Sequence, residues 1–177
     1  MQKLIFGREI MEFMEVIRSR RSIRKYKPDP VPDELVEKVL EAARLIPSGK
    51  NMQPQHFVVV RDPETRRRMQ LRPQTQEAPV IVVGLIDPTM GRCSPSDGII
   101  AFEHLILAAV NYGLGACWKG TYLGHLEEHA EAIKEAIGAP GHMEVVAYTP
   151  LGYPDEDPEP RDKKPLAEMV HYEKFKA

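Results

Sequence analysis

The sequence predicts an α+β fold, an α/β sandwich in which helices flank one small mixed central sheet. Two observations support this prediction. Short β-branched runs alternate with amphipathic helical segments along most of the chain. Hydrophobic residues make up 42% of the 177 residues, which is enough for a core. We expect a single domain over residues 1–177, with residues from about 152 to 177 forming an extended C-terminal arm.

Composition excludes several classes of protein. The net charge of −2 argues against a general nucleic-acid binder, whose domain is usually basic. Cys93 and Cys117 are too few for a disulfide scaffold, so a reduced, cytoplasmic protein is expected. The N-terminus does not read as a signal peptide, and no stretch approaches the roughly 20 apolar residues of a membrane span. We therefore expect neither a nucleic acid nor a membrane as partner.

The first half of the chain predicts two helices, a loop and a strand. Residues 9–20 carry apolar residues at helical spacing, and arginines gather at the end of the segment. Prolines predict an extended connector over 28–32. A second helix is expected over 33–46, followed by a polar loop at 47–54. The run FVVV at 57–60 predicts a central strand.

The second half continues the alternation of helices and strands. Its most apolar helix is hydrophobic on most sides and is expected to be nearly enclosed. The expected elements are a short basic helix at 63–72, a buried strand at 78–86, the apolar helix capped by Asp97, a strand at 115–118 with a turn at Lys119–Gly120, a helix at 126–137 and a strand at 144–151.

The stretch from Arg18 to Lys27 is the densest cluster of charge. Six of its ten residues are basic and none is acidic. Several guanidinium groups beside the Ser22 hydroxyl suit a phosphate or another dense anion. If the segment is extended, Arg20, Ser22 and Arg24 point the same way. From these residues alone, a solvated charge run or a nuclear-localisation-like patch stays open as the alternative.

Two further segments hold candidate site residues. Ser48, Asn51 and Gln53 concentrate hydrogen-bonding side chains in the 47–54 loop, although ordinary turn chemistry accounts for them equally well. GLGACWKG at Gly113–Gly120 contains Gly-x-Gly. It follows a helix and precedes a strand, the reverse of a dinucleotide-binding loop, so we reject a Rossmann site.

No usual catalytic set is apparent. His125 and His129 lie four residues apart and are a possible metal pair, but nothing nearby completes a ligand set. Surface histidines are the simpler interpretation, and we expect no metal. Because no nucleophile, acid or base stands out, an enzyme of this sequence would depend on a cofactor.

Four motifs, taken in order, resemble those of the nitroreductase family of FMN-dependent oxidoreductases. They are RRSIRKY, PSGKNMQPQHF, DGIIAFEHLILAAVNYGLGACWKG and LGYPDEDPEPRDKKPLAEMVHYEKF. The resemblance runs from about Glu12 to the end of the chain. It implies a homodimer with two FMN molecules in the interface and an exchanged C-terminal arm. It also implies hydride transfer from NAD(P)H to flavin N5, then to an electron-poor small molecule such as a nitroaromatic or quinone, by a ping-pong mechanism.

The resemblance implies cofactor contacts from four segments. The first segment would grip the phosphate and ribityl chain with Arg20, Arg21, Ser22 and Arg24, and the second would reach from the partner subunit with Pro47, Ser48, Asn51 and Gln53. The third would lie along the isoalloxazine near N5 with Trp118, Lys119 and Gly120. The arm would close on the phosphate with Arg161 and either Lys163 or Lys164.

The sequence departs from the family pattern at two places. Gln55 stands where many members carry an aromatic residue, and the 87–96 stretch is short. Both departures bear on the choice of substrate. Related flavin chemistry, namely dehydrogenation, reductive dehalogenation or flavin fragmentation, is therefore an alternative. A non-enzymatic anion or nucleic-acid binder is the alternative from a different class.

Overall fold

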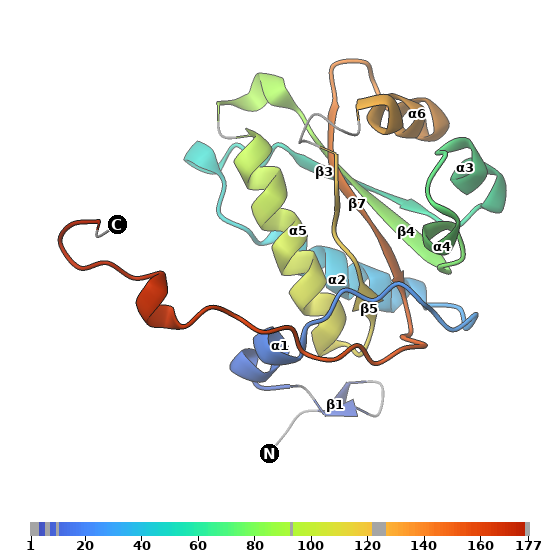
Figure 1. The fold of residues 1–177 in the computed structure, drawn as a ribbon. Coiled ribbons are helices and arrows are strands. Elements are labelled where there is room, and N and C mark those ends of the chain that lie inside the picture. The colour runs from blue at the N-terminus through green and yellow to red at the C-terminus, as the bar shows by residue number, and fades with distance from the viewer. Residues whose placement is uncertain (1–3, 6–7, 10, 93, 122–126, 176–177) are drawn as a thin grey trace.

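The computed structural model has a five-stranded sheet with helices on both faces (Figure 1). The α+β fold class is confirmed. The strand order is β3–β4–β7–β5, and β6 also pairs with β7. The structure describes residues 4–5, 8–9, 11–92, 94–121 and 127–175. The strands are β3 (Gln55–Val60), β4 (Val80–Ile86), β5 (Gly115–Ala116), β6 (Lys119–Gly120) and β7 (Glu144–Gly152), with β1 (Leu4–Ile5) and β2 (Arg8–Glu9) forming a separate pair.

Two details of the predicted sheet are wrong. The strand at 57–60 was expected to be central, but β3 lies at the edge of the sheet, and within the described residues it pairs with β4 alone. Val58 and Val60 on one face of its β-branched run pack in the core on the side of the sheet that α6 (Glu127–Ile137) covers, whereas Val59 on the other face is 37% exposed. The sheet is also not mixed, because every strand pair in the described part of the chain is antiparallel. The one parallel contact recorded there is an isolated bridge between Ser22 and Ala116.

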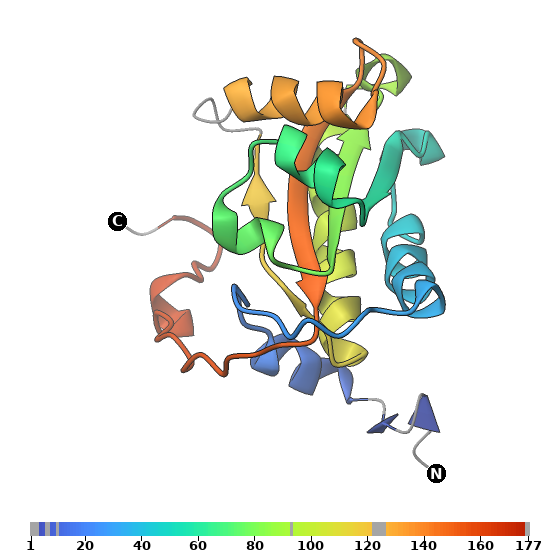
Figure 2. The same ribbon diagram turned by 90° about the vertical axis from the view of Figure 1, so that its right-hand side faces the viewer.

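Alternate residues of β4 face two different cores, as the period of a strand requires. Val80 and Val82 pack with α2 (Asp33–Arg44) and α5 (Ser94–Asn111), whereas Ile81 and Val83 pack on the side of α6. Figure 2 shows α3, α4 and α6 in front of the sheet and α5 behind it. Within the described ranges, no helix has the length and apolar character needed to cross a bilayer. The helices are α1 (Phe13–Ser19), α2 (Asp33–Arg44), α3 (Pro63–Arg68), α4 (Pro73–Gln76), α5 (Ser94–Asn111) and α6 (Glu127–Ile137).

The first helix is shorter than the predicted segment 9–20. The side chain of Glu12 caps α1 by accepting the backbone N–H of Met14 at 2.9 Å. This carboxylate satisfies a donor that the first helical turn leaves unpaired, so the helix begins at Phe13. Arg8 and Glu9 belong instead to the small β1–β2 sheet.

Several apolar side chains that helical spacing predicted to be buried are exposed. Phe13 and Ile17 of α1 are 66% and 41% exposed. Ile99 and Ile100 of α5 are 43% and 38% exposed, so this helix is less enclosed than expected. Exposed apolar groups of this size on two helices indicate a surface that another chain could cover.

The strand expected at 115–118 is shorter, because β5 ends at Ala116. Between β5 and β6 the backbone N–H of Cys117 donates to the side-chain oxygen of Thr149 at 3.0 Å, which replaces a regular ladder bond. The residues predicted as a turn, 119–120, pair with β7 as β6. The backbone at this position is therefore fixed by the sheet.

Helix α5 begins three residues before the predicted cap. The Ser94 hydroxyl donates to the Gly91 carbonyl at 2.7 Å at the start of the helix. Asp97 lies buried in the first turn, and its carboxylate accepts the backbone N–H of Gly49 at 3.1 Å. Asp97 therefore does not cap α5. Instead it ties the 47–54 loop to the helix.

The C-terminal arm leaves the body of the molecule as an extended chain (Figure 1). It starts beside the basic segment, where the backbone N–H of Lys27 donates to the Tyr153 carbonyl at 2.9 Å. A short 3₁₀ turn at Leu166–Glu168 is its one helical element in the described residues. Tyr172 and Phe175 are 78% and 81% exposed, so the tail does not bury its large apolar groups against its own chain.

Replacing Gly84 by alanine tests how tightly α5 packs on β4. A Cβ atom at this position would lie 2.1 Å from Cε2 of Phe102, a ring that is fully buried. We expect Gly84→Ala to lower the free energy of unfolding by about 1–3 kcal/mol, the cost of overpacking a core. Urea denaturation measures it. Gly141→Ala is the control, because a Cβ there meets nothing within 4 Å. Equal midpoints for the two variants would contradict the packing.

Candidate functional site

The basic segment is held against the sheet by its apolar residues. Ile23 is buried and donates its backbone N–H to the Ala116 carbonyl at 3.0 Å. It lies over Gly115, where a Cβ would come within 2.8 Å of the Ile23 side chain. The Tyr26 hydroxyl donates back to the Ile23 carbonyl. With these two residues directed inward, the intervening polar side chains are left to face outward.

A cavity of about 420 Å³ forms where the basic segment meets the C-terminal arm. Its lining combines positive charge from both segments with a single carboxylate among the described residues, that of Glu159. The charged and hydroxyl groups predicted at 20–24 converge here with two of the three cations predicted in the arm. The predicted residues that line it are Arg20, Arg21, Ser22, Arg24, Arg161 and Lys163, and Ile17, Arg18 and Pro158 join them.

Two arginines of this cavity donate to backbone carbonyls rather than to carboxylates. Arg21 donates to the carbonyls of Arg18 and Arg20 at 2.7 and 2.9 Å, and Arg24 donates to the Ser22 carbonyl at 3.1 Å. In the described part of the chain, no ion pair involves a cation of the cavity. Their charges are therefore available to an anion.

One acidic residue positions the segment through its backbone. The Glu156 carboxylate accepts the backbone N–H groups of Arg24 and Lys25, the second at 3.2 Å. Burial raises the pKa of Tyr26 far above its ordinary value; the charges of Cys117 and Glu156 add to this effect and that of Arg24 opposes it. The Tyr26 hydroxyl is therefore a neutral hydrogen-bond donor that fixes the turn.

Trp118, Lys119 and Gly120 lie at β6 and do not line the basic cavity. The Trp118 ring packs edge-on against Phe102, with centroids 5.2 Å apart, and lies across Gly120, where a Cβ would meet the indole nitrogen at 2.7 Å. A second cavity, of about 260 Å³, includes both Arg24 and Lys119. Arg24 therefore joins the two cavities, and a planar ligand anchored in the first can reach this edge of the sheet.

The 47–54 loop lies elsewhere. Figure 1 shows it near the start of α5, whereas α1 and the basic segment lie near the end of that helix. Pro47, Ser48, Asn51 and Gln53 are therefore absent from the basic cavity of their own chain, among the described lining residues. Within the loop, Gln53 donates its backbone N–H to the Ser48 hydroxyl at 3.0 Å and its side-chain amide to the Asn51 carbonyl at 3.3 Å.

The loop holds an unusual backbone conformation. Lys50, Asn51 and Gln53 all have positive φ, at 52°, 57° and 52°. A residue with positive φ is less stable than one in an ordinary backbone conformation. Such a conformation persists only where surrounding contacts impose it. The bond from Gly49 to Asp97 supplies one such contact. A loop kept in this shape is typical of a binding segment.

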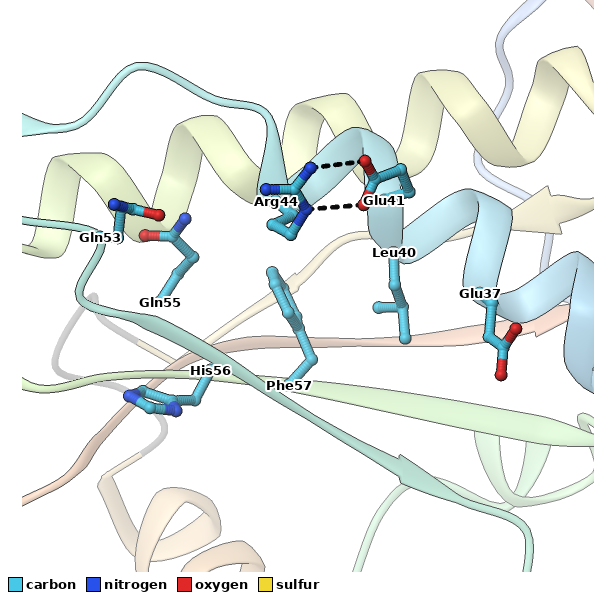
Figure 3. A pocket seen from close by; sticks show the side chains of 8 residues that line it. All are labelled: Glu37, Leu40, Glu41, Arg44, Gln53, Gln55, His56 and Phe57. Carbon is cyan, nitrogen blue, oxygen red and sulfur yellow. Dashed lines mark hydrogen bonds and ion pairs between the residues drawn. The ribbon is translucent and has the colours of Figure 1, made fainter. Parts of the chain in front are cut away.

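A third cavity, of about 480 Å³, adjoins this loop between α2 and the edge strand β3. Figure 3 shows the side-chain amides of Gln53 and Gln55 directed toward each other, with Arg44 paired to Glu41 by two contacts of 2.6 Å. The buried Oε1 of Gln55 has no hydrogen-bond partner within the described residues. The departure from the family pattern at this position thus leaves a polar group where an aromatic ring is common.

Sequence reasoning missed Arg72, which lines the 260 Å³ cavity. It follows the basic helix α3 and looks like one more surface charge of that run. Lys164 was predicted but does not line the basic cavity. The described residues contain no group of three or more His, Cys, Asp or Glu side chains suited to a metal ion. His125, one half of the possible histidine pair, lies outside the described residues.

Comparison with known proteins points to one family. A family model described as "Nitroreductase family" matches residues 17–78. A "Putative NADH dehydrogenase/NAD(P)H nitroreductase" of Methanothermobacter thermautotrophicus is 37% identical over 172 residues, covering 93% of this chain and 88% of the relative. An "NADH dehydrogenase" of Thermus thermophilus is 32% identical over 192 residues, covering 85% of this chain and 91% of the relative.

A solved structure agrees. The solved structure of an "FMN-dependent Nitroreductase" from Clostridium difficile superimposes with a TM-score of 0.81 at 29% identity, covering 92% of this chain and 99% of the other. The order of motifs, the fold and the similarity over nearly the whole length of these proteins lead to one assignment. The chain belongs to the nitroreductase family.

Proposed function

We propose that the protein is an FMN-dependent oxidoreductase that uses NAD(P)H to reduce an electron-poor acceptor, such as a nitroaromatic or a quinone, in a ping-pong cycle. One observation carries the proposal, namely the cavity in which Arg20, Arg24, Arg161 and Lys163 converge without internal ion pairs. The printed names of the relatives, an NAD(P)H nitroreductase and an FMN-dependent nitroreductase, support it. Scarce cysteine and the free Cys117 thiol support a reduced compartment, and we propose the cytoplasm.

The basic cavity fits the phosphate of FMN. A phosphate monoester carries nearly two negative charges at neutral pH and offers three acceptor oxygens. The cavity supplies guanidinium groups, an ammonium group and the Ser22 hydroxyl from two segments, which suits those acceptors. Its volume of about 420 Å³ lies within the range of about 300–1,000 Å³ that is usual for small-molecule sites. Arg21 would contribute charge from the same wall, and Lys164 from outside the lining.

Arg24 would hold the pyrimidine edge of the ring, with Trp118, Lys119 and Gly120 along its length. When bound, FMN would supply the hydride-accepting ring and pass the electrons on to the acceptor. Reduction places negative charge at the pyrimidine edge, so a fixed guanidinium there favours the reduced form. Pairing of β6 with β7 fixes the backbone of Lys119 and Gly120, the segment that would lie along that ring. The chain then needs no acid or base of its own.

We propose that the protein acts as a homodimer in which Pro47, Ser48, Asn51 and Gln53 contact the flavin held by the partner. The separation of this loop from the basic cavity of its own chain supports this arrangement. So do the exposed apolar faces of α1 and α5 and the apolar tail, which a second copy would cover. The arm would wrap around that partner, as its extended course suggests.

The proposed activity is tested by a spectrum followed by a titration. Purified protein should be yellow or should take up FMN one to one with each chain. Under anaerobic conditions NADH or NADPH should bleach the flavin absorbance, and a nitroaromatic added afterwards should restore it. Protein that stays colourless with excess FMN would contradict the proposal. A bound flavin that neither nicotinamide reduces would instead favour one of the related flavin chemistries.

Alanine variants test the phosphate cavity. Arg20→Ala and Arg24→Ala should each weaken FMN binding by about 1.5–3 kcal/mol, the value of a hydrogen bond to a charged group. Trp118 is the sole tryptophan of the chain, so quenching of its fluorescence by FMN gives the dissociation constant. Lys25→Ala removes a neighbouring charge that does not line the cavity and should leave the constant unchanged. Wild-type affinity in both arginine variants would show that the phosphate binds elsewhere.

Mixed dimers test the shared site. Arg24→Ala and Ser48→Ala chains, combined with different affinity tags, place both defects in one site and leave the other intact. Flavin titration of the purified heterodimer should therefore show one wild-type site and one weakened site. The two parent homodimers should show two weakened sites each. If Arg24 and Ser48 served the same site from one chain, the heterodimer would have no wild-type site.

A further inference from the structure

The loop at 47–54 is tied to other parts of the chain near both of its ends. Near its start, the backbone N–H of Gly49 donates to the Asp97 carboxylate at 3.1 Å. At its end, the Pro54 carbonyl accepts the backbone N–H of Asp87 at 2.9 Å. The second bond joins two backbones, whereas the first depends on one side chain. A single substitution at Asp97 can therefore release the start of the loop.

The strained backbone of the loop lies between these two ties. Lys50, Asn51 and Gln53 all have positive φ, and residues in this conformation relax to an ordinary one unless their surroundings hold them. Bonds within the loop, such as that from the Asn51 N–H to the Ser48 carbonyl at 2.9 Å, close the loop on itself. They do not fix its place on α5, and the bond to Asp97 does.

Asp97 is a buried carboxylate, with only 6% of the residue exposed. No ion pair in the described part of the chain includes it. It lies in the first turn of α5, where the positive end of the helix dipole lowers the cost of burying a negative charge. A charged acceptor makes a stronger hydrogen bond to a backbone N–H than a neutral one does. Asp97 therefore holds Gly49 more firmly than an uncharged side chain of the same shape would.

The bond to Asp97 acts next to residues that are proposed above to contact the flavin. Gly49 follows Ser48 in the chain, and the backbone N–H groups of Asn51 and Gln53 both donate to Ser48. A shift of Gly49 would therefore move these three proposed contacts together. Groups that are fixed before a ligand binds lose little freedom on binding, so the ligand binds more tightly.

We propose that Asp97 is a positioning residue, which holds the 47–54 loop in the shape that contacts the flavin of the partner subunit. The inference rests on the proposed function, because the flavin and the shared interface belong to that proposal. Among the described lining residues, Asp97 is absent from both cavities that include Arg24, so it acts through Gly49. Substitution of Asp97 in one chain should therefore weaken the flavin site of the other chain.

The first test measures the FMN affinity of three variants by quenching of Trp118 fluorescence. Asp97→Ala should raise the dissociation constant about tenfold, the lower end of the value of a hydrogen bond to a charged group. Asp97→Asn keeps the shape and an acceptor oxygen, so it should raise the constant only about threefold. Asp62→Ala is the matched control, because it removes an aspartate that accepts the Thr65 backbone N–H at 2.7 Å at the start of α3. It should leave the constant unchanged.

The second test asks which subunit's flavin site depends on Asp97. Asp97→Ala and Arg24→Ala chains with different affinity tags are combined, and the heterodimer is titrated with FMN. It should show one wild-type site and one weakened site, because both defects then fall in the same site. If Asp97 served the flavin of its own chain, or acted by a general loss of stability, no wild-type site would remain and the inference would be overturned.

The third test needs no flavin. In FMN-free protein, the Gly49 amide should exchange its hydrogen with solvent about tenfold faster in Asp97→Ala than in the wild type, because its acceptor is lost. Exchange is followed by NMR. Amides of the β4–β7 ladder are measured alongside, so that a general loss of stability is detected separately. An unchanged rate at Gly49 would show that Asp97 does not hold the loop.

These outcomes separate the inference from the function on which it rests. Wild-type FMN affinity in Asp97→Ala would overturn the role of Asp97 and leave the FMN proposal intact. If the wild type takes up no FMN, the proposed function fails, and the exchange rate of Gly49 still decides whether Asp97 holds the loop. If Asp97→Ala does not fold, Asp97→Asn replaces it in each test. Wild-type values of both the dissociation constant and the exchange rate in that variant would then overturn the inference.

Discussion

The structure depends on holding a run of like charges in one fixed conformation without neutralising them. Ile23 does this by packing on Gly115, where any larger residue would collide with it. Glu156 contributes through backbone N–H groups, so its carboxylate positions the segment from beside the cavity rather than by pairing with a guanidinium inside it. Apolar burial and backbone hydrogen bonds thus offset the repulsion between arginines, and the guanidinium groups keep their capacity to bind an anion.

The two halves of the candidate site lie at opposite ends of α5, and each half shows an uncompensated cost. At one end, three residues of the 47–54 loop adopt positive φ and are tied down by Asp97. At the other, α1 exposes the apolar face that should stabilise it. Exposed apolar area and backbone strain are both unfavourable in an isolated chain. The proposed second subunit accounts for both. It would cover the exposed apolar area, and the flavin that it holds would contact the strained loop.

The sequence predicts the elements well where periodicity is strong and the core alone decides. β4 and β7 are read directly from their apolar runs, and α2 from its stripe. It fails where tertiary contacts decide. Asp97 looks like a cap, yet it bonds a loop 48 residues away in the chain. Residues 119–120 look like a turn because Gly-containing pairs favour turns, yet pairing with β7 prevails. The strand at the edge is decided by the order of the strands in the sheet, and no local sequence pattern contains that order.

For the site, the sequence predicts which residues are charged but not which cavity each side chain faces. Arg24 and Arg72 are both arginines in basic runs, and only the fold shows that they share a cavity while Lys25 and Arg68 stay outside it. Arg24 lines the basic cavity as well, so one guanidinium belongs to both cavities. Where a cofactor supplies the chemistry, the part of the chain is to place charge around it, and the fold rather than the local sequence decides which arginines do so.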